Sequence, residues 1–229
     1  MSKVLKIDEG RNPEIVGQLG AYLAAIQTTG ARVADGFIVP LEQKLEDGAS
    51  NDILRAFEQL GIDEVTLRAS VNLPDRETEV IHRVKREYLL DAISYMQANA
   101  HRRGRMVAII VQKEVNCEII GTTYSINPVT FDKREIMIEA DLWTDANVLN
   151  GVSEPDVVLL NKNTGALAEE SNDETEICLT PKQISELYHT MRKVELAFDE
   201  PVSIGWGYEH GILYILDAHI IKNPRERKV

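Results

Sequence analysis

The end of the chain carries the pattern that most restricts its fold. Apolar and polar residues alternate from Val202 to Trp206, Glu209–Gly211 is rich in turn-forming residues, and Ile212 to Ile221 is again mostly apolar. Alternation with a period of two is typical of β-strands, and two such runs joined by a short turn are typical of a hairpin. We therefore expect an antiparallel hairpin over residues 201–221.

The rest of the chain shows helical and strand patterns in turn. Apolar residues recur at helical spacing between the Asn12–Pro13 start signal and Gly30, and again behind Thr180–Pro181. A shorter helix is expected over 52–60, and one continuous helix over 76–100. Strand patterns cover 33–40, the alternation from Val65 to Arg68 within 64–75, 106–115 and the residues up to Leu160. These elements predict a mixed α/β (α+β) fold.

Composition restricts the classes of partner. The chain has 229 residues, 44% of them hydrophobic, which is enough for a sizeable core in one large domain or in two packed lobes. Its net charge of -12 would repel a phosphate backbone, so we expect no nucleic-acid partner. The basic run His101–Arg105 is interpreted as the end of a helix, where cations are favourable. The acidic run Glu169–Glu176 is interpreted as a solvated loop.

Targeting and cysteine signals point to a soluble cytoplasmic protein. No run of eighteen apolar residues occurs, and the first residues lack the core of a signal peptide. We therefore expect no membrane association. Cys117 and Cys178 stand apart from other cysteines and from histidines at metal-ligand spacing, so free thiols are expected.

Six segments follow motifs of a known family in the correct order. Val16–Leu23 is similar to G-G-K-G-x-N-L, Glu64–Asp75 to V-x-V-R-S-S-A-x-x-E-D, and Met106–Val115 to A-V-x-V-Q-x-M-V. Ile120–Thr130 is similar to S-G-V-x-F-T-x-x-P-x-T, Glu135–Gly151 to I-x-I-E-A-x-x-G-L-G-E-x-x-V-x-G, and Pro201–Ile221 to P-x-D-I-E-W-A followed by L-Y-x-L-Q-x-R-P. Together they resemble the ATP-binding domain of the phosphoenolpyruvate synthase, pyruvate phosphate dikinase and rifampin phosphotransferase family. The resemblance implies an ATP-grasp-like fold with two lobes around a cleft, an N-terminal lobe over 1–111 and a C-terminal lobe over 112–229.

The resemblance also implies a set of nucleotide-binding residues. Arg68 corresponds to the arginine that binds nucleotide phosphates, although a surface arginine at a strand end is the plain alternative. Gln112 and Glu114 fall in the segment that joins the lobes and lines the adenine pocket. Asp217 and His219 stand where the family has a glutamine and an arginine in the closing hairpin. ATP and Mg²⁺ are the cofactors that the resemblance implies, with Asp217 as the candidate metal ligand.

Several family residues are replaced in this sequence. The phosphate-binding lysine corresponds to Leu19, the metal-binding glutamate to Gly205, and the G-L-G-E block to Trp143–Ala146. No glycine occurs between Gly61 and Gly104, so the family's Gly-rich phosphate lid is expected to be missing. The histidines lie outside the contexts of a phosphohistidine segment: His82, His101, His189, His210 and His219. We therefore do not expect conventional phosphotransfer from this chain alone.

Three interpretations remain open at this point. The chain is a non-catalytic or regulatory subunit of a phosphotransfer system, or an active ATP-binding phosphotransferase subunit with a remodelled site that works with separate phosphohistidine and substrate chains. The third interpretation is a structural or small-molecule-binding module on a borrowed fold. A protein partner or separately encoded phosphotransfer subunits are expected under the first two. The substrate, the oligomeric state, and whether Asp217 and His219 replace the lost residues stay open.

Overall fold

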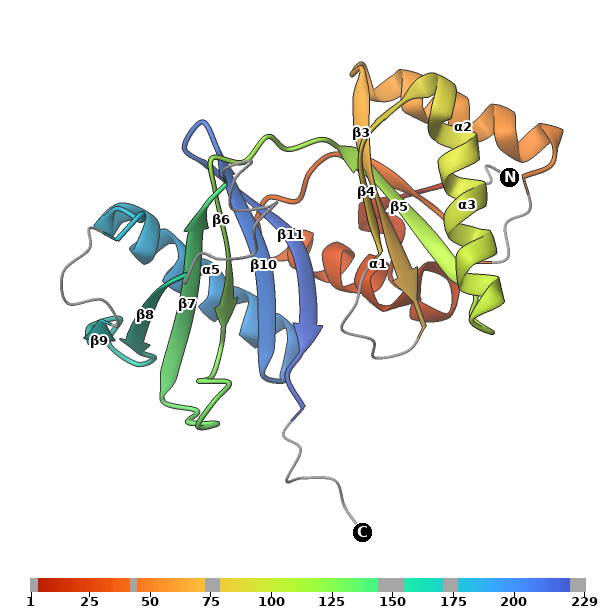
Figure 1. Ribbon diagram of the computed structural model, residues 1–229. Coiled ribbons are helices and arrows are strands. Elements are labelled where there is room, and N and C mark those ends of the chain that lie inside the picture. Colours follow the sequence, from red (N-terminus) through yellow and green to blue (C-terminus); the bar gives the residue numbers. More distant parts are fainter. Residues whose placement is uncertain (1–3, 42–44, 73–78, 144–154, 171–176, 223–229) are drawn as a thin grey trace, which may run out of the picture. The chain divides into compact units, whose positions relative to one another are not determined.

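The computed structural model describes residues 4–41, 45–72, 79–143, 155–170 and 177–222. The chain divides into two compact units, Met1–Thr28 with Val33–Val115 and Thr29–Arg32 with Asn116–Val229. Each unit is built on an antiparallel sheet (Figure 1). Strand β5 continues to Lys113, and the first unit ends at Val115; the predicted lobe boundary between residues 111 and 112 stays a prediction. Among the described residues, no helix combines the length and the apolar character needed to cross a membrane.

The first unit has helices on both faces of its sheet. The strand order is β1 (Leu5–Lys6), β2 (Gly36–Val39), β5 (Val107–Lys113), β3 (Glu64–Val71) and β4 (Val80–Lys85). Helices α2 (Asp47–Leu60) and α3 (Leu89–Arg102) pack on the face that carries Phe37 and Leu67. Helix α1 (Pro13–Thr28) packs on the other face, because Gly20 of α1 approaches Ile38 and Ser70. Two 3₁₀ turns, η1 (Ile7–Glu9) and η2 (Arg86–Tyr88), complete the unit.

Helix α1 begins at the predicted position but contains a bend. The Asn12 side chain accepts a hydrogen bond from the Glu14 amide at 3.0 Å, so it caps the helix. Gly17 has φ 70° and ψ 175°, a conformation that favours glycine, and it interrupts the helix. Beyond the bend, the Ser70 hydroxyl accepts a hydrogen bond from the Gly20 amide at 3.0 Å and donates one to the Val16 carbonyl at 2.7 Å. Ser70 therefore joins both sides of the bend to strand β3.

The predicted continuous helix over 76–100 is wrong. Residues 80–85 form strand β4, and the helix begins only at Leu89; residues 73–78 lie outside the described part. Val84 faces Val65 and Ile81 faces Leu67, so the register shifts between these pairs and β4 carries an extra residue. This bulge places two apolar residues three apart over the same core, which imitates helical spacing.

Glu114 holds the bulge from the end of β5. Its carboxylate accepts hydrogen bonds from the Arg83 amide at 2.9 Å, from the Thr66 hydroxyl, and from His82 Nδ1 at 3.0 Å. Arg83 has φ 55°, the strained conformation of the extra residue. Burial alone raises the pKa of the Glu114 carboxyl, but the hydrogen bonds from His82, Thr66 and Arg83 outweigh it and lower the pKa to about 2. Glu114 is thus an ionised acceptor that fixes strand β4.

In its described residues, the second unit has one sheet with helix α5 on one face. The strand order is β11 (Ile212–Ile220), β10 (Val202–Glu209), β6 (Ile119–Tyr124), β7 (Glu135–Leu142), β8 (Asp156–Asn161) and β9 (Leu167–Glu170). Helix α5 (Pro181–Phe198) is capped by Thr180, whose hydroxyl accepts a hydrogen bond from the Gln183 amide. Tyr208 is buried on the α5 side of the sheet, where its hydroxyl donates to Glu186 at 3.0 Å.

The predicted closing hairpin is confirmed. Strands β10 and β11 pair in antiparallel register from Val202 with Ile220 to Glu209 with Ile212. His210 and Gly211 form the turn with φ of 52° and 74°, the two positive values that a tight hairpin turn of matching twist requires. A bulge interrupts the register between Gly205 and Trp206. The hairpin therefore forms two strands at one edge of the six-stranded sheet.

The bend in α1 leads to a prediction about stability. Replacing Ser70 by alanine removes both hydrogen bonds at a buried position, so we expect a loss of about 1–3 kcal/mol in the free energy of unfolding. Gly17→Ala should lower the free energy of unfolding by at least as much. The methyl group of the new alanine would collide with the Ser70 backbone, and alanine is strained at this positive φ. Urea unfolding measures both changes. Ser94→Ala on the exposed side of α3 is the control, and a Ser70→Ala loss no larger than the control's would contradict this account.

The Glu114 contacts lead to a prediction about pH. The folded pKa lies below the ordinary value of 4.5, so the stabilisation from this carboxylate is present above pH 4.5 and is lost as the pH falls toward 2. Glu114→Gln should therefore lower the free energy of unfolding by about 1–3 kcal/mol at neutral pH and by progressively less in acid. Glu58→Gln, which changes an exposed ion pair with Arg86, is the matched control. A Glu114→Gln loss that does not depend on pH would show that the ionised carboxylate is not responsible.

Candidate functional site

A row of polar residues crosses the face of the second sheet that α5 does not cover. Asp217 on β11 lies opposite Gly205 on β10, Gly205 opposite Thr122 on β6, and Thr122 opposite Glu139 on β7. All four are half-buried, whereas the neighbouring residues that point the other way, such as Ile204, are buried. This face is called the open face below. It brings together two predicted site residues, Asp217 and His219.

Asp217 and His219 form a pair on the open face. They are two residues apart on one strand, so their side chains share a face, and His219 Nε2 lies 3.1 Å from Asp217 Oδ2. The other carboxylate oxygen, Oδ1, accepts a hydrogen bond from the Ala218 amide at 2.7 Å. On β10, the Ser203 hydroxyl lies 3.4 Å from the His219 carbonyl oxygen. The aspartate is therefore held in place by its own strand.

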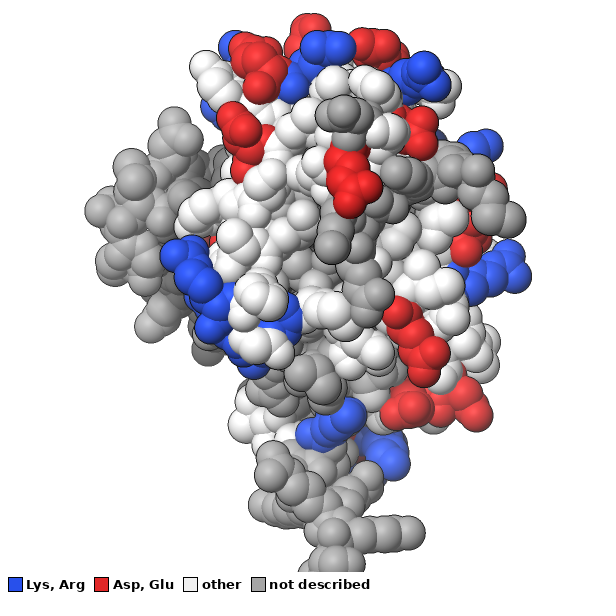
Figure 2. Space-filling view, turned by 90° about the vertical axis from the view of Figure 1, so that its right-hand side faces the viewer, with Lys and Arg blue, Asp and Glu red and all other residues white. Residues whose placement is uncertain are grey.

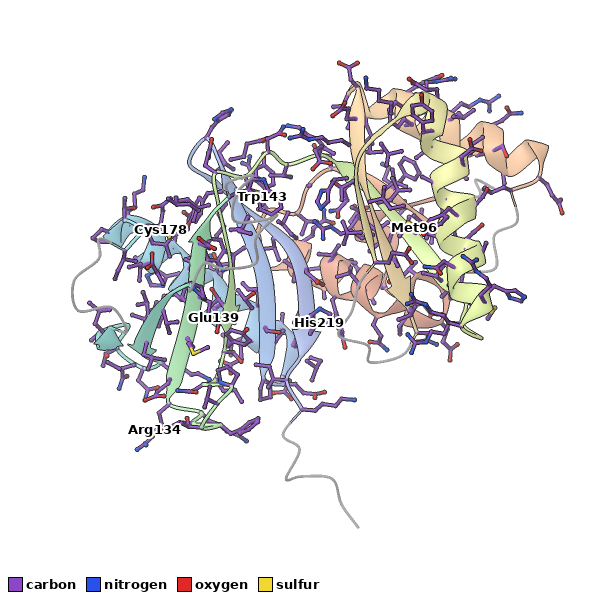
Figure 3. All side chains as sticks on the ribbon, in the orientation of Figure 1. Met96, Arg134, Glu139, Trp143, Cys178 and His219 are labelled. Carbon is purple, nitrogen blue, oxygen red and sulfur yellow. The ribbon has the colours of Figure 1, made fainter. Side chains whose placement is uncertain are left out.

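Glu139 is too far from Asp217 to share an ion with it. The two residues are separated by three strand spacings, which corresponds to about 14 Å. Figure 3 shows Glu139 and His219 on different strands of the sheet, and the Tyr124 hydroxyl donates to Glu139 at 2.9 Å. Within the described ranges, no group of three or more His, Cys, Asp or Glu side chains is arranged to hold a metal ion. A role for Asp217 as metal ligand stays a prediction.

Gly205 lets strand β10 approach Asp217 closely. A Cβ atom built on Gly205 would lie 3.2 Å from the Asp217 Cβ. A side chain at position 205 would thus stand next to the aspartate on the open face. The pair of facing positions carries one carboxylate, on β11, and none on β10.

The other predicted site residues belong to the first unit. Arg68 is half-buried on β3, where it pairs with Ile110 of β5 and Val80 of β4, and it has further contacts within the structure. Ser70 contacts α1, so its side chain points to the face of the sheet that α1 covers. Arg68 is two residues away on the same strand, and its side chain therefore points to the same face. This places the arginine two residues from the contact that fixes the bend in α1.

The side chains of Gln112 and Glu114 form hydrogen bonds that stabilise the first unit. The Gln112 side chain is 2% exposed, and its Nε2 donates a hydrogen bond to the Ala34 carbonyl at 3.1 Å. Glu114 accepts the three hydrogen bonds that hold the bulge of β4. Sequence reasoning did not identify Thr66 and His82 as the partners of Glu114. They lack a spacing signal, because the bulge brings them to Glu114 across two strands. Roles for Gln112 and Glu114 in binding a ligand stay predictions.

Comparison with known proteins shows which family the sequence matches. The family model described as pyruvate phosphate dikinase, AMP/ATP-binding domain, matches residues 61–177. An uncharacterized phosphotransferase of Bacillus subtilis, YvkC, is 31% identical over 137 residues, which are 51% of this chain and 16% of the relative. A probable phosphoenolpyruvate synthase of Methanocaldococcus jannaschii is 27% identical over 149 residues, or 53% of this chain and 12% of the relative. The chain thus matches a small part of the length of these relatives.

Solved structures confirm the fold that the sequence predicted. The VanG D-Ala:D-Ser ligase of Enterococcus faecalis aligns over 88% of this chain and 51% of its own, with a TM-score of 0.52 and 9% identity. The biotin carboxylase domain of the 2-oxoglutarate carboxylase of Hydrogenobacter thermophilus aligns over 87% of this chain and 38% of its own, with a TM-score of 0.52 and 12% identity. These are ATP-grasp-type structures, and the likeness shows a shared mixed α/β fold.

The matched residues contain the strands that carry Arg68, Gln112 and Glu139. The family model covers 117 of the 229 residues, counted from 61 to 177, which is more than half of the chain. The chain belongs to the family of pyruvate phosphate dikinase AMP/ATP-binding domains.

Proposed function

We propose that this chain binds an adenine nucleotide without transferring its phosphoryl group, as a regulatory or partner subunit of a phosphotransfer system. Family membership and the retained Arg68 support the binding half of the proposal. Arginine keeps its charge at every physiological pH and offers a planar set of donors that matches phosphate oxygens. Its position on β3, beside the bend of α1, corresponds to the phosphate-binding arginine of the resembled motif.

The observation that carries the non-catalytic half is the position of Leu19. This residue corresponds to the phosphate-binding lysine of the resembled motif, and its side chain is 5% exposed in the core under α1. A leucine packed in this way has no donor and no charge to offer a phosphate. Since phosphoryl transfer depends mainly on positive charges and metal ions around the moving group, losing this cation removes much of the stabilisation of the transition state.

The open face suggests that the metal site, like the phosphate site, has fewer ligands than the resembled motif provides. The resembled motif has a glutamate and a glutamine on the facing positions that here hold Gly205 and Asp217. One carboxylate with nucleotide phosphates suits a Mg²⁺ ion that keeps several waters, and Asp217 is the residue proposed to supply it. Glu139 lies on β7, about 14 Å away, and is not expected to complete this site.

The partner role rests on the length comparison. The chain covers 16% of the phosphotransferase and 12% of the phosphoenolpyruvate synthase that it resembles. We propose that the phosphohistidine and substrate-binding parts of such a system lie outside these 229 residues. We propose that the chain binds nucleotide as a signal or as a structural cofactor in such an assembly.

A second function, active phosphotransfer with a remodelled site, is favoured by one observation. His219 is oriented by Asp217 at 3.1 Å, an arrangement that supports proton transfer or a contact with a phosphate. Under this alternative, Mg²⁺-ATP would lose its γ-phosphate in the presence of the partner chains, and His219→Gln would abolish that loss. Under the main proposal ATP stays intact with the wild-type protein as well.

The role of Arg68 is tested by nucleotide-dependent melting. ATP or ADP at about 1,000 times its Kd should add about 4 kcal/mol to the free energy of unfolding, which appears as a rise in Tm. Arg68→Ala should weaken binding by about 1.5–3 kcal/mol, the range for a hydrogen bond to a charged group, and Arg68→Lys by less. Arg134→Ala, an exposed arginine paired with Asp132 in the second unit, is the control. The proposal fails if no nucleotide raises Tm.

The role of Asp217 is tested by the effect of Mg²⁺ on affinity. Isothermal titration with ATP in Mg²⁺ and then in EDTA should show tighter binding with the metal for the wild-type protein. Asp217→Asn should remove this gain, about tenfold or 1.4 kcal/mol, and leave the EDTA affinity unchanged. Glu139→Gln keeps the gain if the two carboxylates act separately. A loss in Glu139→Gln with no loss in Asp217→Asn would place the metal elsewhere.

A further inference from the structure

Helix α3 has a buried face and an exposed face that serve different purposes. Leu89, Ile93 and Met96 are 0% exposed and pack in the core of the first unit. Outside this buried face, Tyr88, the last residue of η2 just before the helix, is 62% exposed and Tyr95 is 55% exposed. The fold of the unit thus uses one face of the helix and leaves two tyrosines on its surface.

The exposed residues form a continuous stripe. Tyr88, Tyr95 and Arg102 are separated by seven residues each, close to two helical turns, so they lie on one side of the helix. Ala98, also exposed, lies between Tyr95 and Arg102, and exposed Asp91 lies between Tyr88 and Tyr95. After the helix, Gly104 turns the chain with φ 68°, and Met106 follows with 54% of its surface exposed. We call Tyr88, Tyr95, Arg102, Arg103 and Met106 the Tyr–Arg face.

The Tyr–Arg face ends in positive charge on a strongly acidic chain. Arg102 and Arg103 are exposed and Arg105 is half-buried, whereas the whole chain has a net charge of -12. In the part of the chain that the structure describes, Arg102 and Arg103 form no ion pair with a carboxylate. Figure 2 shows a group of Lys and Arg side chains gathered on the left of this view, with uncharged surface beside it.

The helix dipole explains only part of this arrangement. A cation in the last turn of a helix is stabilising, but the effect is small and restricted to that turn. It gives no reason for the exposed tyrosines about two and four turns before Arg102 on the same side. Tyrosine, arginine and methionine are enriched at the centres of protein interfaces, where they supply most of the binding energy.

We propose that the Tyr–Arg face is a docking surface for an acidic segment of a partner protein. Carboxylates of the segment pair with Arg102 and Arg103, because the planar guanidinium binds a carboxylate through two hydrogen bonds. Apolar side chains of the same segment pack on Tyr88, Tyr95 and Met106. This inference goes beyond the proposed function, since nucleotide binding is not required for it.

Charge also argues against the other occupants. Two copies that met symmetrically through this face would place arginine against arginine, because a two-fold interface brings the same patch together. A long polynucleotide would be repelled by the net charge of -12. An acidic peptide segment meets the arginines without bringing a large negative surface near the rest of the chain.

The test uses two fluorescein-labelled amphipathic peptides that alternate leucine with glutamate or with lysine. Fluorescence anisotropy with the full chain should show salt-sensitive binding of the glutamate peptide and none of the lysine peptide. Arg102→Glu with Arg103→Glu should weaken binding by about tenfold or more, and Tyr95→Ala also by about tenfold, as for hot-spot residues. The matched control is Arg55→Glu with Arg134→Glu, which has the same net charge and changes exposed arginines on other elements.

Four results would overturn the proposal. The first is no binding of the glutamate peptide, and the second is an equal loss in the control pair, which would mean that only net charge matters. The third is binding to phosphatidylserine vesicles that is lost in the same variants, which would identify a lipid surface. The fourth is self-association in sedimentation velocity that disappears in Arg102→Glu/Arg103→Glu, which would identify a second copy. Nucleotide-induced Tm shifts of these variants should match the wild type, so a failure here is separate from a failure of nucleotide binding.

Discussion

Ser70 forms hydrogen bonds to both sides of the bend in α1. The surroundings of Arg68, the candidate phosphate-binding residue, depend on these two bonds. The Ser70 hydroxyl accepts a hydrogen bond from the Gly20 amide and donates one to the Val16 carbonyl, so the helix is bound to strand β3 at two points. Arg68 lies two residues earlier on the same face of β3. Whatever position α1 takes therefore also determines the surroundings of the arginine, and Gly17 allows that position because it accepts φ 70°.

The second unit keeps the fold of the family although several residues of the resembled motifs differ. The ladder between β10 and β11 is formed by backbone groups, which are the same for glycine, glutamate, glutamine or aspartate. Gly205 therefore pairs with Asp217 without any penalty to the sheet, although the carboxylate stands on β11 instead of β10. In the first unit, Leu19 of α1 is likewise compatible with the fold, because its apolar side chain packs in the core. The fold therefore does not depend on the identity of the residues at positions 19, 205 and 217.

The sequence predicted those features that depend on local pattern. The closing hairpin, the start of α1 at Pro13 and the capped start of α5 at Pro181 follow from period-two alternation, turn residues and helix caps. Strand β4 was missed because its bulge separates Ile81 and Val84 by three residues, a helical spacing. The contacts of Glu114 with Thr66, His82 and Arg83 were missed for a related reason. They join residues from three segments, and no local pattern reports such a meeting.

Family membership, a core leucine in place of a cation and a single carboxylate at the facing positions 205 and 217 support one central proposal: the chain holds an adenine nucleotide intact. Equilibrium dialysis of the purified chain against labelled Mg²⁺-ATP, followed by chromatography of the bound nucleotide, tests it most directly. The account predicts saturable binding with the label recovered as ATP. Release of labelled phosphate at a rate proportional to the protein concentration, or no bound nucleotide at any concentration, would contradict it.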